Sequence, residues 1–361
     1  MRPRVAAVVE SCWHRVPGGT AAAAMRTIHA VRALGRHDLV GLAARHGGPP
    51  MLDELGDLDV EHLPLPRPVL YEAWHRLRRP TFAGRIGPVD VVHATGGVMP
   101  PARAGTLVAT MNDLVFLDRP EHLNPRGVRF MSRGFEIARD EAAVILVPSE
   151  ATADACRRHG VDDERLRVVA LGADPTPVDD TARAATRARY DLPDRFALFV
   201  GTLEPRKNLV RLLEAHARAT PDLALVVVGP DGWGESGLTP APGVRRLGRV
   251  GTDDLAALYD LAAAVVYPSL LEGFGLPVLE AMVQGTAAVT SATTSTAEVA
   301  GDTGVLVDPL DVDAIADALV SVRDDPDRWA ALGDAARERG SAFSWAATAR
   351  GVAAVYDEVA S

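Results

Sequence analysis

The chain has 361 residues, 47% of them hydrophobic and 24% charged, and a formal net charge of −10 at pH 7. This length suits two globular domains, and an acidic chain with interspersed charges is not expected to bind nucleic acid, because such binding needs a basic face. The two cysteines, Cys12 and Cys156, are too few for a disulfide framework, and no Cys/His cluster has zinc spacing, so no metal site is predicted.

The first half of the chain alternates short apolar runs with helical patterns, which is typical of an α/β domain. A strand is expected at 5–11, then a turn at Gly18 and Gly19 and an Ala-rich helix over 20–34. The first apolar run is too short for a signal peptide, and no run reaches the roughly 18 residues of a membrane-spanning helix, so a cytoplasmic location is expected. Further strands are expected at 90–95, 106–111, 143–149 and within 162–174.

A polar segment at 175–195, rich in Asp and Pro turns, is expected to separate two domains. The alternation then restarts with a strand at 196–202 and an amphipathic helix at 208–219. The two runs predict two doubly wound, Rossmann-like domains, placed at 1–175 and 192–343, with parallel sheets facing a central cleft and ligands at the carboxyl ends of the strands. Later strands are expected at 223–229, 244–248, 263–269 and 287–291.

The strongest candidate site is the stretch 267–282, with the sequence YPSLLEGFGLPVLEAM. A strand is expected to end at its start, and a helix to begin at Pro277, since proline fits the first helical position. Gly273 and Gly275 precede that helix and let the backbone approach a ligand closely. The free N–H groups and the positive dipole end of a helix favour an anion or a hydroxyl-rich group there.

Two carboxylates, Glu272 and Glu280, flank the start of this expected helix. Each has the chemistry to bind a vicinal diol. Structural roles fit the spacing equally well, because Ser269-x-x-Glu272 matches a capping box and Glu280 has the position of a first-turn acid. Spacing alone leaves both interpretations open.

The second candidate is the turn that contains Arg206, Lys207 and Asn208, just after the strand at 196–202. Two adjacent cations at the ligand-facing end of a strand suit a diphosphate. A solvated basic turn is the alternative. Among 38 Lys and Arg residues Lys207 is the single lysine, in a composition that otherwise replaces lysine by arginine. That contrast favours a specific function for Lys207.

The first domain offers weaker candidates. Gly18 and Gly19 precede a helix, and Asn112 and Asp113 follow a strand, so both pairs are expected at ligand-facing edges. A plain turn and an Asx turn are the alternatives. Residues 72–85 mix aromatic residues with arginine, which suits a lipid surface or a phosphate-bearing acceptor, or else a solvated helix.

Taken together, these motifs resemble the retaining glycosyltransferases of family 4, which have the GT-B fold. The run EGFGLPVLE is similar to that family's E-x7-E motif at Glu272 and Glu280, and FVGTLEPRKNL resembles its diphosphate-binding turn. The segment 248–262 resembles the loop and helix beside the nucleotide base, and PGGTAAAA the N-terminal glycine loop. The last segment, 344–361, resembles the C-terminal helix that returns to the first domain. The likeness is strongest over 196–310.

The resemblance implies roles for individual residues. Arg206 and Lys207 would hold the donor diphosphate and stabilise charge on the leaving nucleotide. Glu272 would bind donor-sugar hydroxyls, Glu280 the ribose hydroxyls, and Val250 would lie near the base. The donor-binding positions that complete the set are Gly18, Gly19, Gly201, Gly273, Phe274, Gly275 and Leu276.

This chain departs from the family pattern at Asn112–Asp113, where family members commonly carry His-Asp. The catalytic set implied here is therefore Arg206, Lys207, Glu272, Asn112 and Asp113. Asparagine can hydrogen-bond a sugar hydroxyl but cannot act as an acid or a base. Either the histidine has no proton-transfer role in the family, or sugar recognition differs here, and an impaired enzyme also stays open.

The expected activity is metal-independent, retaining transfer of a hexose from a nucleotide-diphosphate sugar, with no cofactor, and with the leaving phosphate taking the acceptor's proton. GDP-mannose and UDP-hexoses are both open as donors, with mannose favoured because 112–122 looks like the mannosyltransferase relatives. The acceptor is expected to be a hydroxyl on a sugar, a lipid-linked sugar or a small molecule, with peripheral membrane contact through the Arg-rich helices. The alternatives are a phosphorylase, a sugar-nucleotide epimerase, or a non-catalytic nucleotide-sugar binder.

Overall fold

The structure is a computed structural model that describes residues 2–14, 18–51, 55–103, 105–232 and 241–361. The chain divides into two compact units, unit 1 (Met1–Gly172 with Trp345–Ser361) and unit 2 (Ala173–Ser344). None of the helices in the described ranges is both long and apolar enough to cross a membrane.

Unit 1 contains a seven-stranded sheet in the order β3-β2-β1-β4-β5-β6-β7, and all of its strand pairs are parallel. The chain moves outward from β1 in both directions, so the strand order reverses between β1 and β4 as in a doubly wound fold. The strands are β1 (Arg4–Val8), β2 (Asp38–Arg45), β3 (Val60–Pro66), β4 (Val91–Ala94), β5 (Thr106–Thr110), β6 (Val144–Val147) and β7 (Leu166–Val168).

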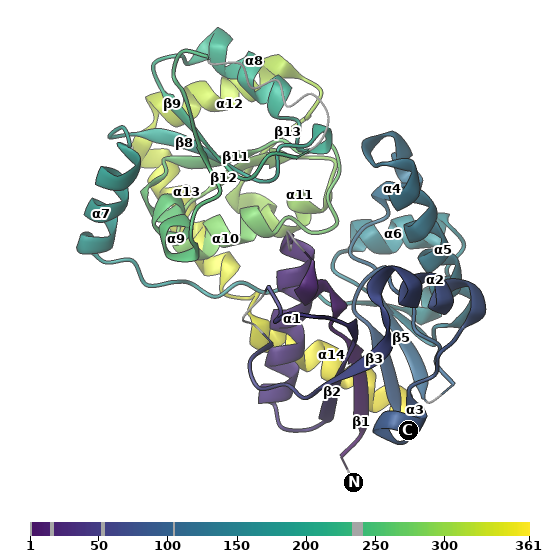
Figure 1. Ribbon diagram of the computed structural model, residues 1–361. Coiled ribbons are helices and arrows are strands. Elements are labelled where there is room, and N and C mark those ends of the chain that lie inside the picture. The colour runs from purple at the N-terminus through teal and green to yellow at the C-terminus, as the bar shows by residue number, and fades with distance from the viewer. Residues whose placement is uncertain (1, 15–17, 52–54, 104, 233–240) are drawn as a thin grey trace. The chain divides into compact units, whose positions relative to one another are not determined.

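Helices cover both faces of this sheet. The C-terminal helix α14, drawn in yellow, packs against the purple helix α1 (Figure 1). The helices and short 3-10 turns of unit 1 are η1 (Glu10–Trp13), α1 (Gly19–Ala33), α2 (Arg67–Leu77), α3 (Ala83–Ile86), α4 (Val115–Asp118), η3 (Pro120–His122), α5 (Pro125–Glu141), α6 (Glu150–Arg158), η4 (Asp163–Arg165) and α14 (Trp345–Ala360).

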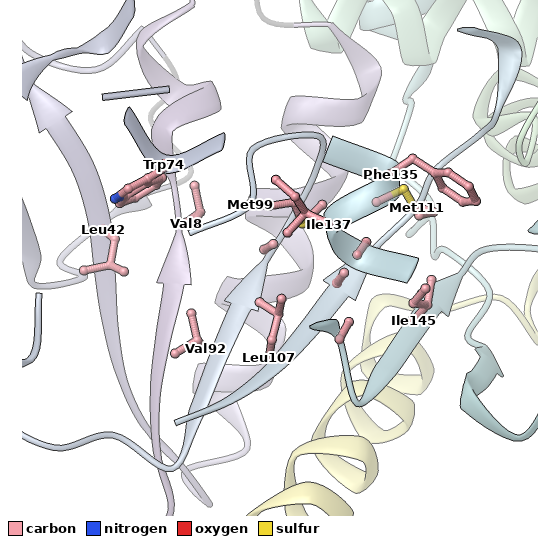
Figure 2. Close-up of a cluster of buried hydrophobic side chains, with 14 of the residues drawn as sticks. Val8, Leu42, Trp74, Val92, Met99, Leu107, Met111, Phe135, Ile137 and Ile145 are labelled. Carbon is pink, nitrogen blue, oxygen red and sulfur yellow. The ribbon is translucent and has the colours of Figure 1, made fainter. Parts of the chain in front are cut away.

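Alternate residues of β1 enter different cores, because successive side chains of a strand point to opposite faces. Val5 and Ala7 join the core beneath α1 and α14. Val8 joins the core on the other face, where Trp74 of α2 and Phe135 of α5 pack (Figure 2). A strand buried on both faces reads as an unbroken apolar run, which is why the sequence identified β1.

Unit 2 contains a six-stranded sheet in the order β10-β9-β8-β11-β12-β13, again parallel throughout. Its central strand β8 pairs with β9 on one side and β11 on the other, which places a second switch point between β8 and β11. The strands are β8 (Phe196–Val200), β9 (Ala224–Val228), β10 (Val244–Gly248), β11 (Ala264–Tyr267), β12 (Ala288–Ser291) and β13 (Val305–Val307).

The helices of unit 2 surround this sheet (Figure 1). They are η5 (Pro205–Lys207), α7 (Asp180–Tyr190), α8 (Leu209–Ala219), α9 (Thr252–Leu261), α10 (Leu276–Gln284), α11 (Ser295–Ala300), η6 (Gly301–Thr303), α12 (Val312–Asp324) and α13 (Pro326–Gly340).

The two doubly wound parallel sheets confirm the predicted fold class. The strands β2, β3 and β13 were not predicted, and the first strand ends at Val8 rather than at residue 11, because η1 begins at Glu10. The segment 175–195, predicted as a polar linker, contains α7. An ion pair of 2.6 Å between Arg183 and Asp260 fastens α7 to α9, so this segment belongs to unit 2.

Candidate functional site

The carboxyl ends of β8 and β11 bring three of the predicted site residues together. Arg206 and Lys207 lie in η5, which follows β8, and Glu272 lies in the connection from β11 to α10. A backbone hydrogen bond of 2.8 Å from the N–H of Leu270 to the carbonyl of Arg206 joins the two connections. Lys207 and Glu272 are 65 residues apart in the sequence, and the sheet brings their side chains into contact.

Lys207 is a buried lysine, with only 7% of its surface exposed. Its Nζ donates to Oε1 of Glu272 at 2.6 Å and to the hydroxyl of Tyr267. The Tyr267 hydroxyl in turn donates to the same Glu272 oxygen at 3.0 Å, and its ring centre lies 5.0 Å from the ammonium. An ammonium, a phenol and a carboxylate thus form a closed hydrogen-bonded triangle, and the solvated-turn alternative for Lys207 is wrong.

Arg206 lies between two carboxylates. Its Nε is 2.6 Å from Oε1 of Glu204, and its Nη1 is 3.1 Å from Oε2 of Glu272. Both oxygens of Glu272 are therefore engaged by cations, one by Lys207 and the other by Arg206. The cluster of Glu204, Arg206, Lys207 and Glu272 holds two positive and two negative charges.

The electrostatics of the cluster follow from burial and pairing. Burial alone raises the pKa of Glu272, but the charges of Lys207 and Arg206 outweigh it and lower the pKa to about 2. Burial lowers the pKa of Lys207, and the neighbouring Glu272 carboxylate opposes that shift. Glu272 is thus a carboxylate at any physiological pH, held in that form by its two cations.

Asn208 fixes the shape of the turn that presents the two cations. Its backbone has φ of 60°, in the left-handed region that asparagine tolerates better than most residues. Its side-chain amide donates to the carbonyls of Pro268 at 2.9 Å and Pro309 at 2.6 Å. Asn208 therefore anchors the turn to the connections after β11 and β13, and the helix α8 begins only at Leu209.

The helix α10 begins at Leu276, one residue earlier than predicted, with Gly275 as its N-cap and Pro277 as its second residue. Gly275 has φ of +103°, and a Cβ there would lie 2.5 Å from Cγ2 of Thr296. Glycine is thus required by both backbone conformation and space. The preceding Phe274 is buried, with its ring centre 6.2 Å from that of Phe343.

Two structural alternatives for the carboxylates are wrong. Gly275, not Ser269, is the N-cap of α10, so Ser269 and Glu272 form no capping box. Glu280 is not in the first turn of α10 either. Its Oε2 accepts a hydrogen bond of 2.9 Å from the hydroxyl of Tyr259 on α9. Burial raises the pKa of the Tyr259 phenol, and the nearby Glu280 carboxylate raises it further. Tyr259 therefore keeps its proton and donates it in the hydrogen bond to Glu280.

The other predicted donor-binding positions of unit 2 lie in the connections that follow strands. Gly201 follows β8, and its carbonyl oxygen would lie 2.0 Å from a Cβ added to Gly229, which follows β9. The two glycines thus let neighbouring backbones meet closely. Val250 is half-buried in the connection between β10 and α9, and Gly273 lies beside Glu272.

The predicted positions of unit 1 lie on separate elements. Gly18 is the N-cap of α1 and Gly19 its first residue, and Pro17 before them lies outside the described residues. Among the residues that the structure describes, a Cβ added to either glycine would meet nothing within 4 Å, and neither glycine has a φ in the left-handed region. The described part of unit 1 therefore gives no reason for glycine at these two positions.

Asp113 has the geometry of the Asx-turn alternative, since its Oδ1 accepts a hydrogen bond of 3.2 Å from the N–H of Val115 at the start of α4. Asn112 lines a hollow in unit 1 together with His93. The ring nitrogens of His93 lie 2.6 Å from the hydroxyl of Tyr356 and 2.8 Å from that of Thr110, and burial lowers its pKa to about 3. Burial thus favours the neutral imidazole of His93, and hydroxyl groups of Tyr356 and Thr110 engage both of its ring nitrogens.

Sequence reasoning missed Glu204, Tyr259 and Tyr267 as members of the site. Their positions carry a weak signal, since Glu204 precedes the two cations and Tyr267 lies near the end of the strand predicted at 263–269. Within the described ranges, no group of three or more His, Cys, Asp or Glu side chains is arranged to hold a metal ion.

Comparison with known families matches both units. Residues 17–176 match the family described as Glycosyltransferase Family 4, and residues 183–339 match Glycosyl transferases group 1. The O-antigen chain mannosyltransferase B of Escherichia coli is 34% identical over 301 residues, which is 77% of each chain. The MMP alpha-(1->4)-mannosyltransferase of Mycolicibacterium hassiacum is 32% identical over 77% of this chain and 72% of its own. The chain belongs to glycosyltransferase family 4.

Solved structures support the same fold. HepE of Anabaena, in complex with UDP and glucose, aligns with a TM-score of 0.77 at 19% identity, over 99% of this chain and all of its own. WaaG, a glycosyltransferase of lipopolysaccharide biosynthesis, aligns with a TM-score of 0.71 at 18% identity, over 97% and 99% of the two chains. The two Rossmann-like units are therefore those of the GT-B glycosyltransferases.

Proposed function

We propose that this glycosyltransferase is a retaining hexosyltransferase that moves a hexose, with mannose favoured, from a nucleotide-diphosphate sugar to a hydroxyl acceptor. One observation carries the proposal, namely that Lys207 and Arg206, in the turn after β8, both contact Glu272 in the connection that leads into α10. Cations and a helix N-terminus are the groups that stabilise a diphosphate, and a fixed carboxylate beside them is the group that orients sugar hydroxyls.

The chemistry follows from where charge develops. As the glycosyl–phosphate bond breaks, negative charge grows on the diphosphate oxygens, and Lys207 and Arg206 stabilise it without a metal ion or other cofactor. The leaving phosphate takes the proton of the acceptor hydroxyl on the same face of the sugar, so the anomeric configuration is retained. Glu272 serves as a sugar-binding residue and not as a nucleophile, because transfer on one face of the sugar needs no side-chain nucleophile.

Asn112 supports this assignment of the proton to the phosphate. An amide has no acid or base function near neutral pH, so Asn112 can contribute only hydrogen bonds to a sugar hydroxyl. If the departing phosphate is the base, the replacement of a histidine by Asn112 changes sugar recognition and leaves proton transfer intact. Asp113, whose Oδ1 accepts a hydrogen bond from the N–H of Val115, then shapes the turn that follows Asn112.

The relatives named above as mannosyltransferases support GDP-mannose as the donor. A UDP-hexose is the competing donor, because the Anabaena structure contains UDP and glucose. The proposed acceptor is a sugar, a lipid-linked sugar or a small alcohol. Contact with a membrane stays a prediction, which the exposed Val69 and Leu77 of the arginine-containing helix α2 support. The cytoplasmic location also stays a prediction.

A ligand screen followed by a transfer assay tests the proposal. GDP-mannose is expected to raise the melting temperature more than UDP-glucose, ADP-glucose or GDP alone, in the presence of EDTA as well as in its absence. With methyl α-mannoside as the trial acceptor, the proton NMR spectrum of the product should show an α-linked hexose. Inverted stereochemistry or a strict requirement for a divalent ion would overturn the mechanism.

The same assay separates the alternatives. Donor binding with neither transfer nor slow hydrolysis would identify a non-catalytic binder. Sugar release that depends on added phosphate would identify a phosphorylase, and an epimerised donor formed without acceptor would identify an epimerase. Lys207→Ala and Glu272→Ala should each lower turnover by about 10²-fold or more while the circular dichroism spectrum stays unchanged.

A further inference from the structure

The proposed donor site raises a problem of charge. Glu204 and Glu272 neutralise Arg206 and Lys207 at distances between 2.6 and 3.1 Å, so the four side chains sum to zero. A diphosphate that approaches this cluster gains little net attraction while both carboxylates stay in place. Favourable binding requires that at least one of them give up its cations.

The two carboxylates differ in how they are built into the fold. Glu204 belongs to the same turn as the cations, and its carbonyl accepts a 3.0 Å hydrogen bond from the N–H of Lys207. Glu272 reaches the cations from a different connection, where Ser295 Oγ holds its backbone carbonyl at 3.0 Å. Rotation of the Glu272 side chain therefore breaks its ion pairs and leaves the backbone of both connections unchanged.

Lys207 has a second partner that does not depend on Glu272. Tyr267 is fully buried at the end of β11, and its hydroxyl and ring both contact the ammonium. A buried ammonium with no partner is costly, and the phenol supplies one while the carboxylate moves. Arg206 likewise keeps an ion-pair partner while Glu272 moves, because its Nε lies 2.6 Å from Oε1 of Glu204.

We propose that Glu272 is an internal counter-ion that the donor diphosphate displaces from Lys207 and Arg206, which frees Glu272 to bind the hydroxyls of the donor sugar, while Tyr267 holds Lys207 during the exchange. This inference rests on the proposed function. It makes the site selective for a nucleotide sugar over the bare nucleotide, because only the sugar gives the displaced carboxylate new partners. Once the sugar has been transferred, Glu272 returns to the cations and competes with the nucleotide product.

Isothermal titration with GDP and GDP-mannose, and with UDP and UDP-glucose as the second pair, tests the exchange at fixed ionic strength. Glu272→Gln keeps the shape and removes the charge, so GDP should bind about three- to tenfold more tightly than to the unsubstituted protein, while the preference for GDP-mannose over GDP is lost. Tyr267→Phe should weaken GDP binding several-fold. Glu272→Asp, which keeps the charge with a shorter reach, should tighten GDP binding to a smaller extent.

Glu204→Gln is the matched control, because it also removes a carboxylate from Arg206. It should tighten GDP and GDP-mannose equally and leave their ratio unchanged. Equal or weaker GDP binding by Glu272→Gln would overturn the inference and leave the proposed function standing. An unsubstituted protein that binds none of the four nucleotides would instead overturn the proposed function itself.

Discussion

The ammonium of Lys207 lies 5.0 Å from the centre of the Tyr267 ring and donates a hydrogen bond to the hydroxyl of that residue. Both side chains are buried, so the space around Nζ is filled by the phenol and by Glu272. A compact ammonium fits between these groups, whereas a planar guanidinium is wider and needs a forked partner. The composition of the chain favours arginine everywhere else, and this contact gives a physical reason for lysine here.

Lys207→Arg is therefore expected to fail although it keeps the charge. Overpacking should lower the free energy of unfolding by about 1–3 kcal/mol, and misplacement of the cation should lower kcat/KM by about 10²-fold. Urea unfolding and steady-state kinetics measure the two effects. Arg206→Lys is the control, since the Arg206 side chain is 22% exposed and should accept the change with a smaller loss. A fully active Lys207→Arg variant would contradict a specific requirement for lysine.

The depressed pKa of Glu272 predicts a dependence of stability on pH. Its folded-state pKa of about 2 lies below its ordinary value of 4.5, so its ion pairs contribute stability above pH 4.5, and this contribution is lost as the pH falls toward 2. At pH 7 the Glu272→Gln variant should be less stable than the parent by about 3 kcal/mol, because the buried Lys207 and the half-buried Arg206 lose a partner. At pH 3 the difference should be smaller. Equal differences in urea unfolding at both pH values would contradict the assignment.

The Tyr259–Glu280 hydrogen bond predicts a separate effect at the nucleotide end of the donor. If Glu280 binds the ribose, the Tyr259 hydroxyl positions its carboxylate, and Tyr259→Phe should raise the KM for the donor several-fold with little change in kcat. Glu280→Gln should also raise the KM for the donor, and by a larger factor than Tyr259→Phe. An effect of Tyr259→Phe on kcat alone would argue that Glu280 acts on the transferred sugar.

Two glycines offer a contrast between folding and binding. Gly275→Ala places a Cβ 2.5 Å from Thr296 and forces alanine into a left-handed conformation, so it should lower the free energy of unfolding by about 1–3 kcal/mol. A Cβ at position 19 meets none of the described residues within 4 Å, so Gly19→Ala should change stability by less than about 0.5 kcal/mol.

If the Gly18–Gly19 turn approaches the donor phosphates, as the family resemblance implies, Gly19→Ala should still lower kcat/KM by about tenfold. Thermal unfolding and donor kinetics measured on the same preparation separate the two effects. Unchanged kinetics in Gly19→Ala would place this turn away from the donor.

The sequence indicated the fold through buried strands that read as unbroken apolar runs, such as β1, β8 and β11. It missed β3, whose residues are mostly half-buried or exposed, because an edge strand lacks that signal. It also took α7 for a linker, since the helix presents mostly polar residues and buries only Thr186. Amphipathic signals are weak where an element is held by ion pairs to its neighbour.

The sequence by itself determined the parallel α/β architecture, the family, and the single lysine beside an arginine as a position under constraint. Local patterns suffice for these three conclusions, because buried strands, glycine turns and motif spacings can each be recognised from residues that are close together in the sequence. Only the tertiary structure decided that Lys207, Tyr267 and Glu272 form one closed hydrogen-bonded triangle and that Glu204 completes its charge balance. Those contacts join the ends of β8 and β11, and pairing between strands far apart in the chain cannot be read from either segment alone.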